Sequence, residues 1–129
     1  MAVDLEGALG GPRPSIDLAQ ISVDSPEGWP LVFVFDTFTT RYLLEQRGPD
    51  SLRALFADPS IVKVLHCMHG DAMSLFLEYG VTLCNVSDTG LADAALRLKN
   101  DKRSLDTVIK AYIDCDMTHK GAFVHVPGM

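Results

Sequence analysis

Three acidic residues have types and a spacing that could hold a divalent cation. Asp4 and Glu6 stand two apart in a segment that predicts a strand, so their carboxylates leave the same strand face. Paired carboxylates repel each other, and a hard cation such as Mg²⁺ or Mn²⁺ relieves that repulsion through oxygen ligands. Asp71 follows a predicted strand and opens a predicted helix, where α/β sheets usually bind ligands. Taken alone, these patterns favour simpler explanations: a solvated strand end for Asp4 and Glu6, and a favourable helix N-terminal charge for Asp71.

The elements that must position these acids alternate between strands and helices. Turn-forming residues at 10–14 and 25–28 separate three β-branched and aromatic segments, which predicts an antiparallel meander. A fourth strand follows a helical crossover and should pair parallel with its neighbour. The fold class is therefore α/β, a mixed sheet flanked by helices. The predicted strands are 2–7, 16–23, 31–35 and 61–65, with an extended segment at 81–86, and the predicted helices are 40–46, 49–57, 71–79, 88–98 and one beginning after Ser104.

Length and charge limit what the chain can be. Its 129 residues carry 11 Lys and Arg against 17 Asp and Glu, a net charge of −6 that fits one acidic domain and argues against a basic nucleic-acid clamp. The longest apolar run, 30–35, is far shorter than the roughly 20 residues of a membrane-spanning helix. The N-terminus lacks the basic start of a secretory signal. We therefore expect an intracellular protein, cytoplasmic or nuclear, with no membrane partner.

The cysteines and histidines predict neither disulfides nor zinc. Cys67, Cys84 and Cys115 are odd in number and lack a short paired spacing, which predicts three reduced, mostly buried thiols. His66 and His69 could join them around zinc, but the usual C-x₂₋₄-C and H-x₃₋₅-H spacings are absent. Cys67 lies in no acyl-transfer motif, so a nucleophilic role is not favoured either.

Several motifs, in order along the chain, resemble the 3'-5' exonuclease domain of the RNase D (DEDDy) type. The similarity covers nearly the whole chain and is nearest to the exonuclease-domain-containing proteins that include Egalitarian. It implies an RNase H-like fold and a two-metal exonuclease that removes nucleotides from the 3' end of RNA or DNA. The motifs are Val3-Asp-Leu-Glu-Gly7, the segments 16–23, 33–36 and 55–66, Gly70-Asp71, and Asp88-Thr89 with Ala92.

The resemblance also implies which residues carry the reaction. The first two acids of the family match Asp4 and Glu6, and the aspartate of its second motif matches Asp71, so these three are the expected catalytic residues and Mg²⁺ or Mn²⁺ ligands. Gln20, His66 and Asp88 are weaker candidates for substrate contacts, because an exposed sheet face, packing at a strand end and a helix cap explain them as well. The stretch 97–103, with four basic residues and one acidic residue, could touch phosphates or form a solvated loop.

Two departures from the family pattern predict an incomplete domain. The fourth acid belongs to a late Tyr-x-x-x-Asp motif, and Tyr112 with Asp116 fits only the bare spacing, too early in the family's order. Met1 stands three residues before Asp4, where the family has preceding structure. We therefore expect residues 1–129 to be a single domain without its last catalytic helix.

Two functions stay open on this basis. The first is an exonuclease with a weak second metal site and little or no activity as an isolated chain. The second is a catalytically inactive relative that binds nucleic acid or protein. Apolar surface left uncovered by a missing helix would favour a protein partner or self-association.

Overall fold

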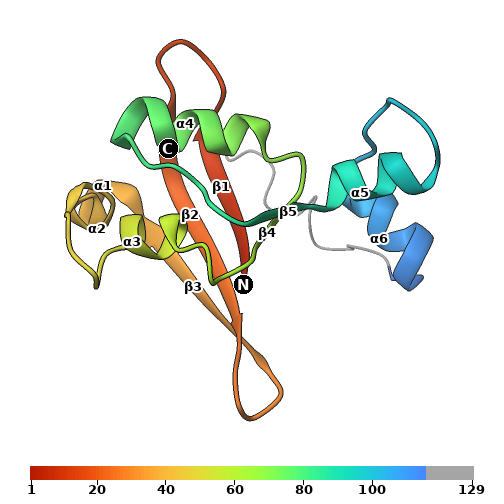
Figure 1. Cartoon of the computed structure of the whole chain (residues 1–129), viewed down its shortest axis with the longest axis horizontal. Helices are drawn as coiled ribbons and strands as arrows, with labels where there is room; N and C mark the ends of the chain where they lie inside the picture. The colour runs from red at the N-terminus through yellow and green to blue at the C-terminus, as the bar shows by residue number, and fades with distance from the viewer. Residues whose placement is uncertain (116–129) are drawn as a thin grey trace, which may run out of the picture. The chain divides into compact units, whose positions relative to one another are not determined.

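A mixed sheet of five strands positions the predicted acids in the computed structural model, which describes residues 1–115 (Figure 1). The order is β3-β2-β1-β4-β5, with β1, β2 and β3 antiparallel and both β4 and β5 joined in parallel. The strands are β1 (Ala2–Ala8), β2 (Ser15–Asp24), β3 (Pro30–Asp36), β4 (Lys63–Leu65) and β5 (Val86–Asp88). The predicted meander and parallel fourth strand are confirmed, and β5 adds a second parallel strand.

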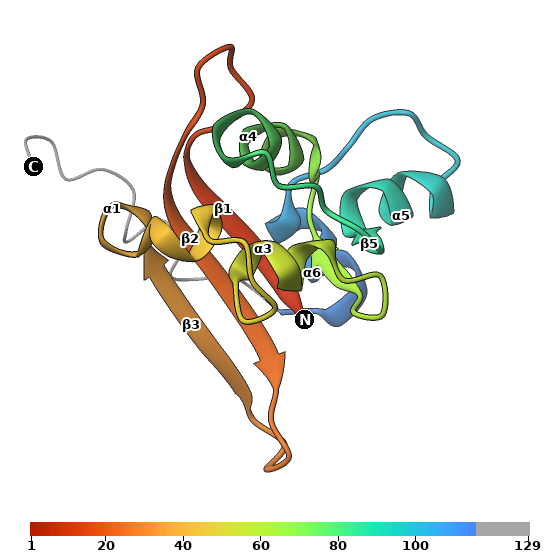
Figure 2. The same cartoon turned by 60° about the vertical axis from the view of Figure 1, so that its left-hand side comes forward.

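Helices connect these strands and continue beyond β5. The chain divides into two compact units, Met1–Thr89 and a second that begins at Gly90. Figures 1 and 2 both show α3 and α4 over one face of β1 and β2 within the first unit. The helices are α1 (Thr37–Thr40), α2 (Tyr42–Glu45), α3 (Leu52–Ala57), α4 (His69–Tyr79), α5 (Thr89–Leu96) and α6 (Leu105–Ile113). No helix in the described part of the chain has the length and apolar character needed to cross a membrane.

The two faces of β1 separate the core from the acids. Val3 and Leu5 are buried, whereas Asp4 and Glu6 are exposed, as the two-residue period of a strand requires. The buried side chains of β1 and β2 form one cluster with residues from the covering helices. That cluster contains Val3, Leu5, Ile16, Ala19, Ile21, Leu44, Phe56, Leu65, Leu75, Tyr79 and Val81.

Several helix boundaries differ from the predicted ones because side-chain caps set them. The helix expected at 40–46 is two short helices, and the first begins early because the Asp36 carboxylate accepts the Phe38 N–H. The helix predicted at 49–57 begins later, at Leu52, because Ser51 caps α3 by accepting the Ala54 N–H. Of the predicted extended segment 81–86, only Val86 lies in a strand, because β5 spans Val86–Asp88.

Three further expectations concern the helices of the second unit and the burial of the cysteines. Helix α5 ends at Leu96, before the predicted Leu98, whose φ of 54° is left-handed. Ser104 caps α6 as predicted, accepting the Thr107 N–H. The expectation of mostly buried thiols is wrong, since Cys67 and Cys84 are only half-buried and Cys115 is exposed, because they lie outside the core cluster.

A β-bulge lies beside Glu6 and explains the irregular pattern of β2. The β1–β2 register shifts between Glu6 and Gly7, so that Asp17 is the extra residue of β2. The bulge keeps Ile16 and Ala19 on the buried side and leaves Leu18 38% exposed. Gly7 has a φ of 146°, and a Cβ there would lie 2.1 Å from the Ser15 carbonyl oxygen. Only glycine therefore fits at the end of the segment that carries the two acids.

Substitution of Gly7 tests this constraint. We expect Gly7→Ala to lower the free energy of unfolding by about 2 kcal/mol or more, because the added methyl meets backbone and the φ disfavours a side chain. The matched control is Gly11→Ala, since a Cβ at Gly11 meets nothing within 4 Å. Urea unfolding of both variants measures the difference, and equal midpoints would contradict the strained bulge.

Candidate active site

The sheet topology brings the three predicted acids to one edge. Strands β1 and β4 are parallel neighbours, with Ala2 opposite Val64, so their carboxyl ends point the same way. Glu6 lies near the end of β1, and Asp71 lies in the first turn of α4, which follows β4. Asp71 is only 8% exposed, in contrast to the exposed Asp4 and Glu6. One buried and two exposed carboxylates therefore share this edge.

The charges of these carboxylates act on Asp71. Burial, followed by the negative charges of Asp4, Glu6 and Asp88, raises the pKa of Asp71 from its ordinary 3.8 to about 6. No cationic side chain counts among the causes of this shift. A carboxyl group with such a pKa at an acidic edge is the electrostatic pattern of a cation site or an acid-base site.

The side-chain positions do not complete a metal cage. Within residues 1–115, no group of three or more His, Cys, Asp and Glu side chains is arranged to hold a metal ion. The oxygen donors match the preference of Mg²⁺ and Mn²⁺ in chemical type. The charges of Asp4 and Glu6 thus act on Asp71, while the oxygens of the three acids do not converge on one point.

Gln20 is paired with Asp4 across the antiparallel strands. The two residues are directly opposite in the β1–β2 register, and the Gln20 Nε2 donates to the Asp4 Oδ2 at 3.3 Å. Gln20 thus lies on the acidic face of the sheet, where it orients Asp4.

The other two weak candidates, His66 and Asp88, lie at the carboxyl ends of β4 and β5. The His66 Nδ1 lies 2.9 Å from the Thr89 hydroxyl oxygen. The Asp88 carboxylate accepts the backbone N–H groups of Cys67 and Met68 at 2.9 and 3.0 Å. Both residues therefore have partners within the fold, and their expected contacts with substrate stay predictions.

A buried serine, which the sequence reasoning missed, fixes the β1–β2 turn against α4. The Ser74 hydroxyl accepts the Gly10 N–H at 3.0 Å and donates to the Gly70 carbonyl at 2.7 Å. A Cβ on Gly70 would lie 3.7 Å from the Leu9 Cβ, so the turn packs beside the residue that precedes Asp71. A serine on the buried stripe of the predicted helix 71–79 was the signal that could have identified this contact.

The basic stretch 97–103 is partly neutralised within the second unit. Arg97 and Arg103 both form ion pairs with Asp93, whose side chain is 0% exposed. The Tyr112 hydroxyl donates to the same carboxylate at 3.1 Å. These contacts, led by the Arg103 hydrogen bond, hold the pKa of Asp93 well below its usual range. Two of the four basic side chains thus have a structural role, and Lys99 and Lys102 carry the rest of the positive charge.

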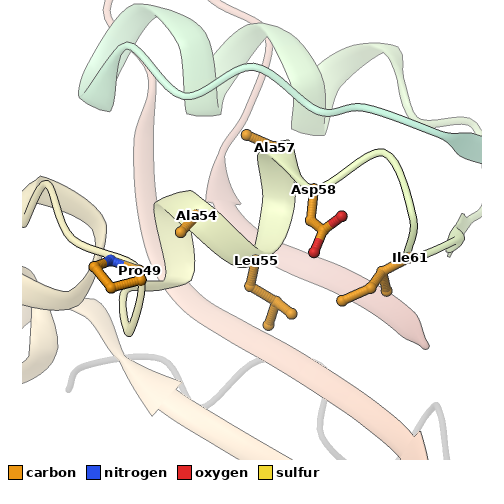
Figure 3. A pocket seen from close by; sticks show the side chains of 6 residues that line it. All are labelled: Pro49, Ala54, Leu55, Ala57, Asp58 and Ile61. Carbon is orange, nitrogen blue, oxygen red and sulfur yellow. The ribbon is translucent and has the colours of Figure 1, made fainter.

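A surface hollow of about 520 Å³ lies apart from the acids, along α3 and the loop that follows it (Figure 3). It is largely apolar, and its one charged lining residue, Asp58, accepts the Ser60 N–H and hydroxyl at 2.8 and 2.6 Å. None of the predicted site residues lines it. The lining residues are Pro49, Ala54, Leu55, Ala57, Asp58 and Ile61.

Comparison with known proteins gives a consistent result. Residues 2–123 match a 3'-5' exonuclease family. Protein RRP6-like 1 of Arabidopsis thaliana is 31% identical over 116 residues, which cover 84% of this chain but only 18% of that protein. Trypanosoma brucei RNase D in complex with RNA U12 has a TM-score of 0.71 at 22% identity, covering 89% of this chain and 40% of that one. Brucella melitensis NrnC with bound Mg²⁺ has a TM-score of 0.66 at 24% identity, covering 90% of this chain and 54% of that one.

The raised pKa of Asp71 predicts a pH-dependent cost to stability. Between about pH 4 and 6 the folded chain holds this proton more tightly than the unfolded chain, so stability falls as pH rises through that window. At pH 7 without divalent metal, we expect Asp71→Asn to be more stable than wild type by about 1 to 3 kcal/mol. The gain should vanish below pH 4, where Asp71 is protonated in both the folded and the unfolded chain.

Urea unfolding at pH 7 and pH 3.5 with EDTA measures this effect. The control is Asp24→Asn, which removes an exposed carboxylate that is not among the charges acting on Asp71. A loss of stability in Asp71→Asn at pH 7 would show instead that the ionised carboxylate is stabilised by a partner.

Proposed function

The chain belongs to the 3'-5' exonuclease family that its residues 2–123 match, and from that membership we propose a metal-dependent domain that hydrolyses phosphodiester bonds at the 3' end of RNA or DNA. The observation that supports the proposal is that the charges of Asp4 and Glu6 act on the buried Asp71, so the three carboxylates share one electrostatic environment. The chain spans less than a fifth of RRP6-like 1, so the activity of a longer protein is part of this proposal.

The proposed ligands of the cation are Asp4, Glu6 and Asp71. Their oxygens are the donors that Mg²⁺ and Mn²⁺ take, and positive charge would relieve the repulsion that raises the pKa of Asp71. Bound divalent ions of this kind supply Lewis acidity, which activates water and offsets phosphate charge. The chain's own contribution is to hold the ligands: Gln20 orients Asp4, and the first turn of α4 carries Asp71. The bound Mg²⁺ of NrnC supports this choice of ion.

The proposed substrate is a nucleic-acid 3' end, with RNA and DNA both open. The RNA in the RNase D complex supports a nucleic-acid ligand for this fold. We propose Gln20, His66 and Asp88 as weaker substrate contacts, since they lie on the same sheet face or the same sheet edge as the acids.

We also propose that the family's reaction uses two metal ions, and that these 129 residues alone carry it out only slowly. They contain no late Tyr-x-x-x-Asp motif that matches the family's order. The Tyr112 hydroxyl, in the nearest match, is bound to Asp93, and Asp116 lies outside the described residues. Three carboxylates can complete one metal site with water and phosphate, whereas a second site would lack a protein ligand.

A catalytically inactive module that binds nucleic acid or protein is the second candidate. It is favoured by one observation: the acidic side chains in the described residues are not arranged as a metal-binding group. Loss of metal chemistry would leave the fold and its exposed surfaces available for binding.

Cleavage of a 5'-labelled oligonucleotide tests the first candidate against the second. We expect slow, Mn²⁺-dependent shortening from the 3' end, which Asp4→Asn abolishes because it removes one of three ligands. Asp24→Asn is the matched control and should keep wild-type activity, since the exposed Asp24 lies at the far end of β2 from the bulge beside Glu6.

Binding without cleavage, with or without Mn²⁺, would support the inactive module. Fast cleavage by wild type would contradict the proposed impairment and show that three acids suffice.

A further inference from the structure

We propose that Asp88 and Thr89, named here the β5 clasp, position Asp71 by holding the backbone that leads into α4. This inference rests on the proposed function, because it concerns the placement of one proposed metal ligand. In this role Asp88 and Thr89 act through the protein backbone, separately from the substrate contact proposed above for Asp88.

Asp88 is suited to bind backbone. It ends β5, stands opposite Leu65 in the parallel pair, and is only 9% exposed. Its Oδ1 accepts the Cys67 N–H and its Oδ2 the Met68 N–H, at 2.9 and 3.0 Å. A side chain that binds two neighbouring N–H groups at once needs two acceptor atoms. A carboxylate has two acceptor oxygens, whereas an asparagine amide has only one.

Thr89 binds the two residues that precede Cys67 and Met68. Its hydroxyl donates to the Leu65 carbonyl at 3.2 Å and lies 2.9 Å from the His66 Nδ1. Because a hydroxyl has a single hydrogen, Thr89 accepts from the His66 Nδ1, which therefore carries the ring proton in this arrangement. Together the clasp residues contact four consecutive residues, Leu65 to Met68.

The clasped segment has features that need such support. Cys67 has a φ of 56°, a left-handed conformation that a non-glycine residue keeps only when its surroundings fix it. Met68 is the N-cap of α4 but has no side-chain capping bond. Its carbonyl accepts the Ala72 N–H at 2.9 Å, so its orientation sets the first turn of α4. Asp71 lies in that turn, three residues after Met68.

Mn²⁺ titration calorimetry and amide hydrogen exchange on the whole chain test the clasp. Asp88→Asn removes one acceptor, and Thr89→Val removes the hydroxyl without changing charge. We expect both to weaken Mn²⁺ binding on the order of tenfold, as loss of groups that orient metal ligands commonly does. Exchange should accelerate at the amides of residues 67–72. Thr89→Ser keeps the hydroxyl and should restore wild-type behaviour, and Asp24→Asn controls for a lost charge.

The outcomes separate this inference from the proposed function. Wild-type Mn²⁺ affinity in both Asp88→Asn and Thr89→Val would overturn the clasp while leaving the metal site intact. A wild-type chain that binds no Mn²⁺ would overturn the proposed function, and exchange would then decide alone. Faster exchange confined to 67–72 supports the clasp, whereas unchanged exchange there, or a uniform increase through general destabilisation, overturns it.

Discussion

Repulsion among carboxylates at one edge of the sheet is the constraint on which the rest of the site depends. Asp71 is nearly buried, and the charges of Asp4, Glu6 and Asp88 oppose its ionisation. Folding alone gains nothing from collecting these charges around Asp71, because they make its carboxyl group costlier to ionise. The arrangement becomes more favourable when a cation joins the group, as the proposed metal site requires.

The scaffold holds the acids through backbone geometry more than through side-chain pairing. The bulge at Gly7 ends the strand segment that carries Asp4 and Glu6, and the buried hydroxyl of Ser74 fixes the β1–β2 turn on α4. The carboxylate of Asp88 does the same for the entry to α4. These contacts come from three elements distant in sequence, so the acidic edge is a product of the tertiary fold.

The sequence predicted those features whose causes are local. The alternation in β1 separated Val3 from Asp4, Ser104 correctly marked a helix start, and the predicted helix end at residue 79 is confirmed. Egalitarian-like ancestry and the substrate contacts of the weak candidates remain predictions. The clasp was not predictable from the sequence, because there Asp88 has the features of an ordinary helix cap. Only the parallel pairing of β4 and β5 shows that it lies opposite Leu65. Nor could a pattern of residues show how the oxygens of Asp4, Glu6 and Asp71 are directed.

Paramagnetic broadening by Mn²⁺ in an amide NMR spectrum tests the central claim most directly, because it locates a bound ion without requiring turnover. A single site made by Asp4, Glu6 and Asp71 predicts that substoichiometric Mn²⁺ first broadens the amides of β1 near residues 4–6 and of α4 near residue 71. Broadening that begins elsewhere, or that spreads evenly over exposed acidic residues, would contradict the account.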